Sequence, residues 1–135
     1  MRLALIFAVF YAAGFMHALC AVSVFATSLV GLIRSEKYKL ARIAASKLSP
    51  VLAGLSVLIL TAYVSEFCFA FYCKNPYEFY DFWQRIVGPY AVLYWTKLLA
   101  GYVLPQLFWI PRVRCSMVTL YFGSFIVVVA TQLNT

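Results

Sequence analysis

An all-α integral membrane protein is the fold class that the sequence predicts, and three observations indicate it. The chain is 65% hydrophobic and only 11% charged, whereas roughly a quarter of the residues in a soluble domain are charged. Its mean hydropathy of +0.91 leaves too little polar surface to cover a globule in water. A helix needs about 20 residues to cross a bilayer, and each of four apolar runs reaches or nearly reaches this length. We therefore expect one membrane domain, residues 1–135, with four transmembrane helices.

The first predicted helix covers residues 3–33, which contain no Asp, Glu, Lys or Arg. Arg2 followed by apolar residues also fits the start of a signal peptide, but the run continues without a clear small-residue cleavage site, so we expect a retained helix. His17 lies near its middle. Membrane b-type haem usually takes two axial histidines, and the chain has one. A histidine that hydrogen-bonds between packed helices is therefore favoured over a haem ligand shared with a partner.

Three further apolar runs predict the other helices. They are residues 48–73 with the single charge Glu66, residues 86–110 with the single charge Lys97, and residues 116–133 with none. Membrane strands are short and alternate in hydropathy, so these long continuous runs favour helices.

Two other features of these runs concern packing. Pro105 cannot donate a ladder hydrogen bond and its ring meets the carbonyl of Gly101, so a kink is expected in the third helix. The four cysteines are Cys20, Cys68, Cys73 and Cys115. Their spacing matches no metal-site pattern, so we interpret them as small packing residues and assign no disulfide.

Charges at bilayer depth are the clearest functional signal, because each costs about 2.5 kcal/mol or more unless it is paired or hydrated. With continuous helices rising 1.5 Å per residue, Glu66 lies about 12 Å and Lys97 about 18 Å from the same interface. A lysine stem can cover the difference, so we predict an ion pair between these two residues. Two interpretations stay open. The pair cross-links the bundle, or Glu66 exchanges protons with a carrier or a file of water, with Tyr63, Tyr94, Gln106 and Lys97 as neighbours.

Basic residues gather in two of the three predicted connections. They are Arg34, Lys37, Lys39, Arg42 and Lys47 against the acid Glu36 in the first, and Arg112 and Arg114 in the third. By the positive-inside rule these connections face the cytoplasm or, in an organelle, the matrix. Both termini then face the outer side, although Arg2 is mild contrary evidence. Phosphate-binding glycine loops and nucleic-acid modules are absent from the sequence, so we expect no nucleic-acid partner.

The second connection, within residues 74–90, combines acids, prolines and aromatic rings. Its rings are Tyr77, Phe79, Tyr80, Phe82, Trp83 and Tyr90. Tyrosine and tryptophan favour the headgroup level of a membrane. We expect a short amphipathic segment in the outer interface, with Asn75-Pro76 at its start and Gly88-Pro89 opening the next helix.

The stretch NPYEFYDFWQRIVGPYAVLYWTKLLAGYVLPQLFWIPRVR, residues 75–114, resembles the later part of a known family. It is similar to the NrfD/polysulfide-reductase membrane subunits, and most closely to the ActC-type subunit of bacterial alternative complex III. The matching residues are Asn75-Pro76-Tyr77-Glu78, Arg85, Gly88-Pro89-Tyr90, Tyr94-Trp95, Pro105-Gln106-Leu107, Trp109, Arg112 and Arg114. The preceding YVSEFCFAFY continues the similarity, with Glu66 in the family's acidic position. Lys97 is not part of the family pattern.

The resemblance implies most of the second four-helix bundle of the NrfD-like fold, in a bacterial cytoplasmic or mitochondrial inner membrane. In that family the membrane subunit carries no metal, and electrons pass between quinone and the iron–sulfur clusters of an outer partner, then to haem or another acceptor. We therefore expect no cofactor bound by this chain alone, quinone or quinol at a partner interface, and clusters and haem on partners. Because the family's quinone pocket belongs chiefly to the earlier helices, a partner would supply the first bundle, and this chain should not oxidise quinol by itself.

The expected function is a small integral subunit of a quinone-linked respiratory complex that scaffolds the quinone side and aids proton movement. The candidates for the outer-face surface near partner and quinone are Asn75, Tyr77, Glu78, Arg85 and Tyr90. The alternatives are a non-catalytic assembly subunit and a stand-alone four-helix transporter.

Overall fold

The structure, a computed structural model, describes residues 2–72 and 75–132, with side chains placed from residue 8 onward. Within these ranges every regular element is helical, so the all-helical class is confirmed. The elements are α1 (Arg2–Ile33), η1 (Ser35–Lys37), α2 (Tyr38–Tyr72), α3 (Pro76–Val87), α4 (Ala91–Thr96), η2 (Lys97–Val103), η3 (Leu104–Trp109), α5 (Pro111–Cys115) and α6 (Met117–Gln132).

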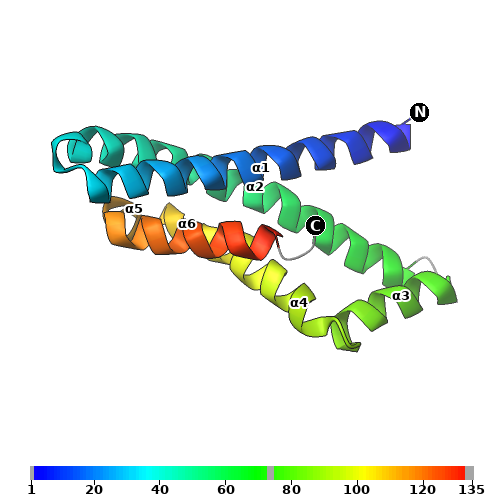
Figure 1. Ribbon diagram of the computed structural model, residues 1–135. Helices are drawn as coiled ribbons and strands as arrows, with labels where there is room; N and C mark the ends of the chain where they lie inside the picture. The colour runs from blue at the N-terminus through cyan, green and yellow to red at the C-terminus, as the bar shows by residue number, and fades with distance from the viewer. Residues whose placement is uncertain (1, 73–74, 133–135) are drawn as a thin grey trace.

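Two helical segments are long and apolar enough to cross a membrane, Ala8–Ile33 and Ser35–Tyr72, and α6 is a shorter apolar helix. The helices α1 and α2 form a hairpin, joined by η1 (Figure 1). The helix α6 packs along α1, while η2 and η3 pack against α2 and α6. The ribbons lie close together near η1 and diverge toward the N-terminus of α1 and toward α3 (Figure 1).

Two predicted helix boundaries differ from the structure. The second helix begins at Tyr38, well before the predicted residue 48. The charged residues of this first stretch are good helix formers and project from the surface, so they limit the apolar run without ending the helix. The third predicted helix, 86–110, is interrupted near its start. The helix α3 ends at Val87, and a corner at Gly88 separates it from α4, which begins at Ala91.

Steric contact explains why the residue at this corner is glycine. A Cβ atom there would collide with the backbone carbonyl oxygen of Gln84, which cannot move aside as a side chain can. The backbone nitrogen of Gly88 donates to that same carbonyl at 2.9 Å. Across the corner, the indole nitrogen of Trp95 donates to the backbone oxygen of Ile86 at 3.2 Å, which ties α4 to α3.

Prolines change the backbone hydrogen bonding at two places. Near Pro105, where the sequence predicts a kink, the helix changes from α to π over Lys97–Val103 and then to 3-10 over Leu104–Trp109. Pro50 lies inside α2 and cannot donate to the carbonyl of Ser46. The hydroxyl of Ser49 donates to that carbonyl instead, at 3.2 Å. Such a substitute partner is needed wherever no water reaches the backbone.

Small side chains allow close packing at the centre of the bundle. Ala21, Ala45 and Ala53 are fully buried where α1 meets α2 and where α2 meets η3. Phe108 of η3 lies against Gly123 of α6, where an added Cβ atom would be 2.9 Å from the ring. Contacts of this kind hold helices together in lipid, where the hydrophobic effect between helices is weak.

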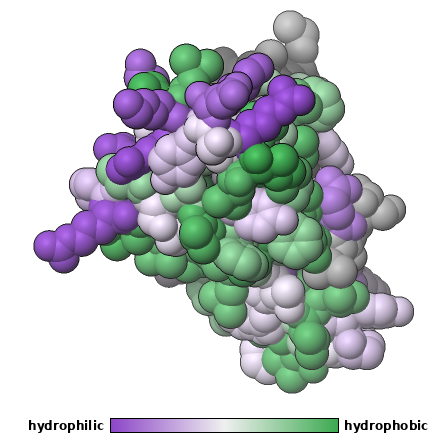
Figure 2. Space-filling model, turned by 60° about the vertical axis from the view of Figure 1, so that its left-hand side comes forward, coloured by the Kyte–Doolittle hydropathy of each residue, from purple (hydrophilic) through white to green (hydrophobic). Residues whose placement is uncertain are grey.

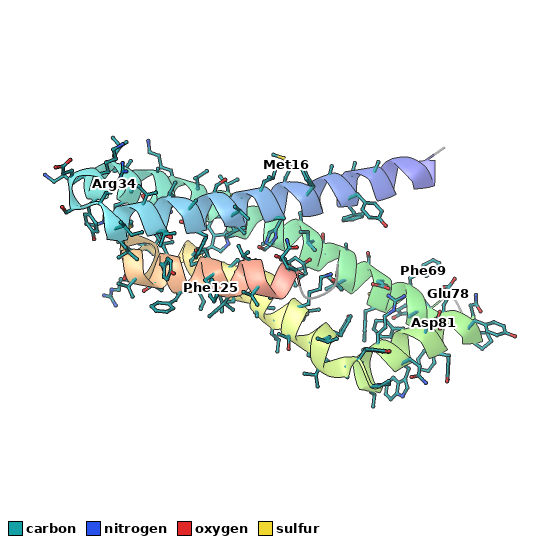
Figure 3. The ribbon with its side chains drawn as sticks, in the orientation of Figure 1. Met16, Arg34, Phe69, Glu78, Asp81 and Phe125 are labelled. Atoms are coloured by element: carbon teal, nitrogen blue, oxygen red, sulfur yellow. The ribbon has the colours of Figure 1, made fainter. Side chains whose placement is uncertain are left out.

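The two ends of the molecule differ in chemistry. Hydrophilic side chains gather at one end of the face in Figure 2, and much of the remaining face is apolar. Arg34 lies at the end that carries η1, whereas Glu78 and Asp81 lie at the opposite end on α3 (Figure 3). This separation agrees with a long axis that runs across a membrane.

Candidate functional site

A cavity of about 1000 Å³ lies among α1, α2, the end of α3, α4, η2 and the end of α6. It occupies the region where the helices diverge in Figure 1. Six of the ten predicted site residues line it: Tyr63, Glu66, Arg85, Tyr90, Tyr94 and Lys97. These residues come from four different elements, so the fold brings together side chains that the sequence separates.

Glu66 forms its ion pair with Arg85 and not with Lys97, so the predicted pairing is wrong. The Nη1 atom of Arg85 lies 2.6 Å from Oε1 of Glu66. The reason is the corner at Gly88, which lets α3 fold back and bring its last turn beside α2. The side chain of Arg85 is 55% exposed and that of Glu66 is 45% exposed, so the pair lies at the mouth of the cavity.

Lys97 lines the same cavity but makes no hydrogen bond or ion pair with any residue that the structure describes. It is also nearer to the end of the molecule that carries α3 than continuous helices would imply. Since the helix restarts at Ala91, Lys97 lies about 9 Å along it at 1.5 Å per residue. The wall therefore carries two cations against one carboxylate, and the carboxylate is already paired.

Aromatic rings connect the mouth of the cavity with its inner end. The ring centroids of Tyr94 and Tyr63 are 6.0 Å apart, those of Tyr63 and Tyr102 are 5.6 Å apart, and those of Tyr102 and His17 are 5.3 Å apart. Each ring carries groups that can both donate and accept a hydrogen bond. Tyr102 was not predicted as a site residue, because nothing in the sequence signals that η2 turns it toward α1.

His17 links α1 to α2 at the inner end of the cavity. Its Nε2 atom is 2.8 Å from the Oγ atom of Ser56, and both residues are buried. The Ser56 hydroxyl donates to the carbonyl of Leu52 at 2.8 Å. Its oxygen therefore accepts from His17, which assigns the proton to Nε2. The predicted hydrogen bond between packed helices is confirmed.

Gln106 does not line the cavity, unlike the other proton-path candidates. Its amide nitrogen lies 3.3 Å from the carbonyls of Ala53 and Tyr102, and donates to both. Its Oε1 atom accepts from the indole nitrogen of Trp109 at 3.0 Å. With both ends of the amide engaged, Gln106 attaches η3 to α2.

The remaining outer-face candidates lie at the start of α3. Asn75 is the N-cap, and its side-chain oxygen accepts from the backbone nitrogen of Tyr77 at 3.2 Å. Tyr77 and Glu78 are exposed. On the other side of α3, Phe82 is buried and packs edge-on against Phe67 of α2, 5.6 Å between centroids. The expected amphipathic segment is therefore a helix that rests on the end of α2.

Cys20, Cys68 and Cys115 are free thiols, and Cys73 lies outside the described residues. The thiol of Cys20 donates to the carbonyl of Leu48 at 3.6 Å, so it serves as a packing residue between α1 and α2.

The arrangement places several groups that can donate and accept hydrogen bonds along one cavity. An exposed ion pair marks its mouth, phenol rings line its length, and a hydrogen-bonded imidazole marks its inner end. No protein-family model and no curated protein matches the chain.

Proposed function

We propose that this chain is a small integral membrane subunit of a quinol- or quinone-linked respiratory complex. In this role it crosses an energy-transducing inner membrane four times, with both termini on the outer side. It scaffolds the quinone side and exchanges protons at the cavity. It resembles the second bundle of the NrfD-like membrane subunits, and a partner supplies the first bundle.

One observation carries the proposal. Four residues that support the resemblance, Glu66, Arg85, Tyr90 and Tyr94, stand on three separate elements or at their ends, and all four line one cavity. The other matching residues, among them Asn75 and Gln106, lie outside the cavity, where they cap or attach helices.

Proton exchange would take place at the mouth. The guanidinium of Arg85 is permanently charged and holds the carboxylate of Glu66 in position. Both groups are partly exposed, so water in the cavity can reach the carboxylate. The phenols of Tyr63 and Tyr94 adjoin this pair and can extend the hydrogen-bonded route inward. The redox chemistry belongs to partners, which bind the iron–sulfur clusters and the haem.

An assembly subunit without a proton function is the second candidate, and the ion pair itself favours it. Arg85 and Glu66 join α3 to α2, and a buried or half-buried pair can serve orientation alone. The glutamine variant argued in the Discussion separates the two functions.

Co-purification tests the proposed membership. The tagged full chain should be extracted from its native membrane in a mild detergent, and bound proteins should be identified by mass spectrometry together with a redox difference spectrum. We expect partners with iron–sulfur or haem sites and a further helical subunit. The same tag on an unrelated multi-pass protein of that membrane is the control. A colourless chain that elutes alone would contradict the proposal and favour a stand-alone transporter.

A further inference from the structure

The charge of Lys97 has no counter-ion within the described residues. Among the described residues that line the cavity, Glu66 has the only carboxylate. This carboxylate already forms an ion pair with Arg85 at 2.6 Å. An ammonium group at this depth in a membrane is costly unless an anion or water accompanies it. Water in the open cavity can hydrate the ammonium group, and the excess positive charge also favours an anionic group from outside the described residues.

The position of Lys97 limits where that anionic group can lie. The lysine is about 9 Å along the helix from Ala91, the first helical residue after the corner. A lysine stem runs along apolar surface and can carry its ammonium group several ångströms toward the membrane interface. Lys97 can therefore reach the level at which lipid phosphates lie, which a residue near the bilayer centre could not.

The walls of the cavity suit an amphiphile better than a small ion. Beside the charged groups, the lining includes the apolar residues Phe10, Phe15 and Leu93, and Gly14 leaves open space where a side chain would stand. The hydroxyl groups of tyrosines such as Tyr94 stand near the charges and can donate to phosphate oxygens. The volume of about 1000 Å³ is at the upper end for ligand pockets.

We propose that this cavity binds one anionic phospholipid, whose headgroup phosphate pairs with Lys97 and whose acyl chains lie along the apolar part of the wall. The inference rests on the membrane placement in the proposed function but not on the respiratory role. It also assigns a purpose to Lys97, which lies outside the family resemblance. The bound lipid would occupy the apolar side of the space where the helices diverge, between α1 and α4, and would leave the exposed side of the Glu66–Arg85 pair to water.

Lipid binding can be measured directly on the purified full chain with any subunits that remain attached. After removal of bound lipid in a neutral detergent, dioleoyl phosphatidylglycerol or dioleoyl phosphatidylcholine is added, and retained lipid is counted by native mass spectrometry. We expect one phosphatidylglycerol per chain, bound about tenfold more tightly than phosphatidylcholine. Inorganic phosphate should not displace it.

Lys97→Met keeps the length and apolar body of the side chain and removes its charge. We expect this variant to lose about tenfold in affinity for phosphatidylglycerol, with binding of phosphatidylcholine unchanged. Lys47→Met is the matched control, because Lys47 is an exposed cation of α2 near the opposite end. It should bind phosphatidylglycerol as the unmodified chain does.

Three results would overturn the proposal. They are equal retention of the two lipids, unchanged binding in Lys97→Met, and displacement by inorganic phosphate, which would indicate a site for a free anion. If Lys97→Met does not fold, the comparison of the two lipids and of phosphate on the unmodified chain still decides the matter. None of these measurements involves quinol turnover, so failure here is distinct from failure of the proposed function.

Discussion

Glu66→Gln is expected to lower the quinol turnover of the assembled complex by about a hundredfold, which is the usual scale for loss of one positioned proton-transfer group. Glutamine keeps the shape of the side chain and can still accept from Arg85, but it cannot take up and release a proton. The measurement is steady-state quinol oxidation by the purified complex, with the amounts of all subunits compared by mass spectrometry.

Two variants make this result specific. Asp81→Asn removes an exposed carboxylate from α3 at the same end of the molecule, so it should leave turnover unchanged. The double variant Glu66→Gln with Arg85→Gln removes both charges of the pair. If the pair only cross-links α2 and α3, the double variant should recover turnover, because no unpaired charge remains. If Glu66 carries protons, the double variant should stay as slow as Glu66→Gln, and intact turnover in Glu66→Gln would exclude the proton role.

Phe108→Ala is expected to cost about 3 kcal/mol of folding free energy, which corresponds to a melting temperature lower by about 10 °C. Phe108 is only 1% exposed and is the largest of the fully buried side chains in the described ranges. Its ring lies against Gly123, so truncation opens a gap between η3 and α6 that neither backbone can close. Thermal unfolding in a fixed detergent, followed by circular dichroism, measures the change.

Phe122→Ala provides the matched comparison. Phe122 also belongs to α6, but it is 58% exposed and faces away from this packing. Its truncation should lower the melting temperature by only a few degrees. Equal effects of the two substitutions would mean that η3 and α6 do not pack as described.

Patterns along the sequence were enough to predict the helical class and the hydrogen bond of His17, since both depend on composition and on the scarcity of polar groups in an apolar run. The partner of Glu66 was not predictable from helix lengths. The estimate of depth assumed that 86–110 is one helix, whereas the corner at Gly88 brings Arg85 to Glu66 and leaves Lys97 without an ion pair among residues 8–72 and 75–132.

The cavity depends on features that have no local signature. Tyr102 reaches the wall because η2 is wound as a π-helix, which turns it toward His17. Gln106, only four residues further, instead donates to Ala53 because the backbone has tightened to a 3-10 helix. Both depend on how Pro105 disturbs the hydrogen bonding upstream, and sequence alone indicates the disturbance without its direction.

The most direct test of the central claim, membership of a quinone-linked respiratory complex, is quinol-dependent acceptor reduction in membranes from cells that lack this chain. We expect activity to fall to background and to return when the unmodified chain is supplied again, while the partner subunits are still synthesised. Undiminished activity in the absence of the chain would contradict the claim.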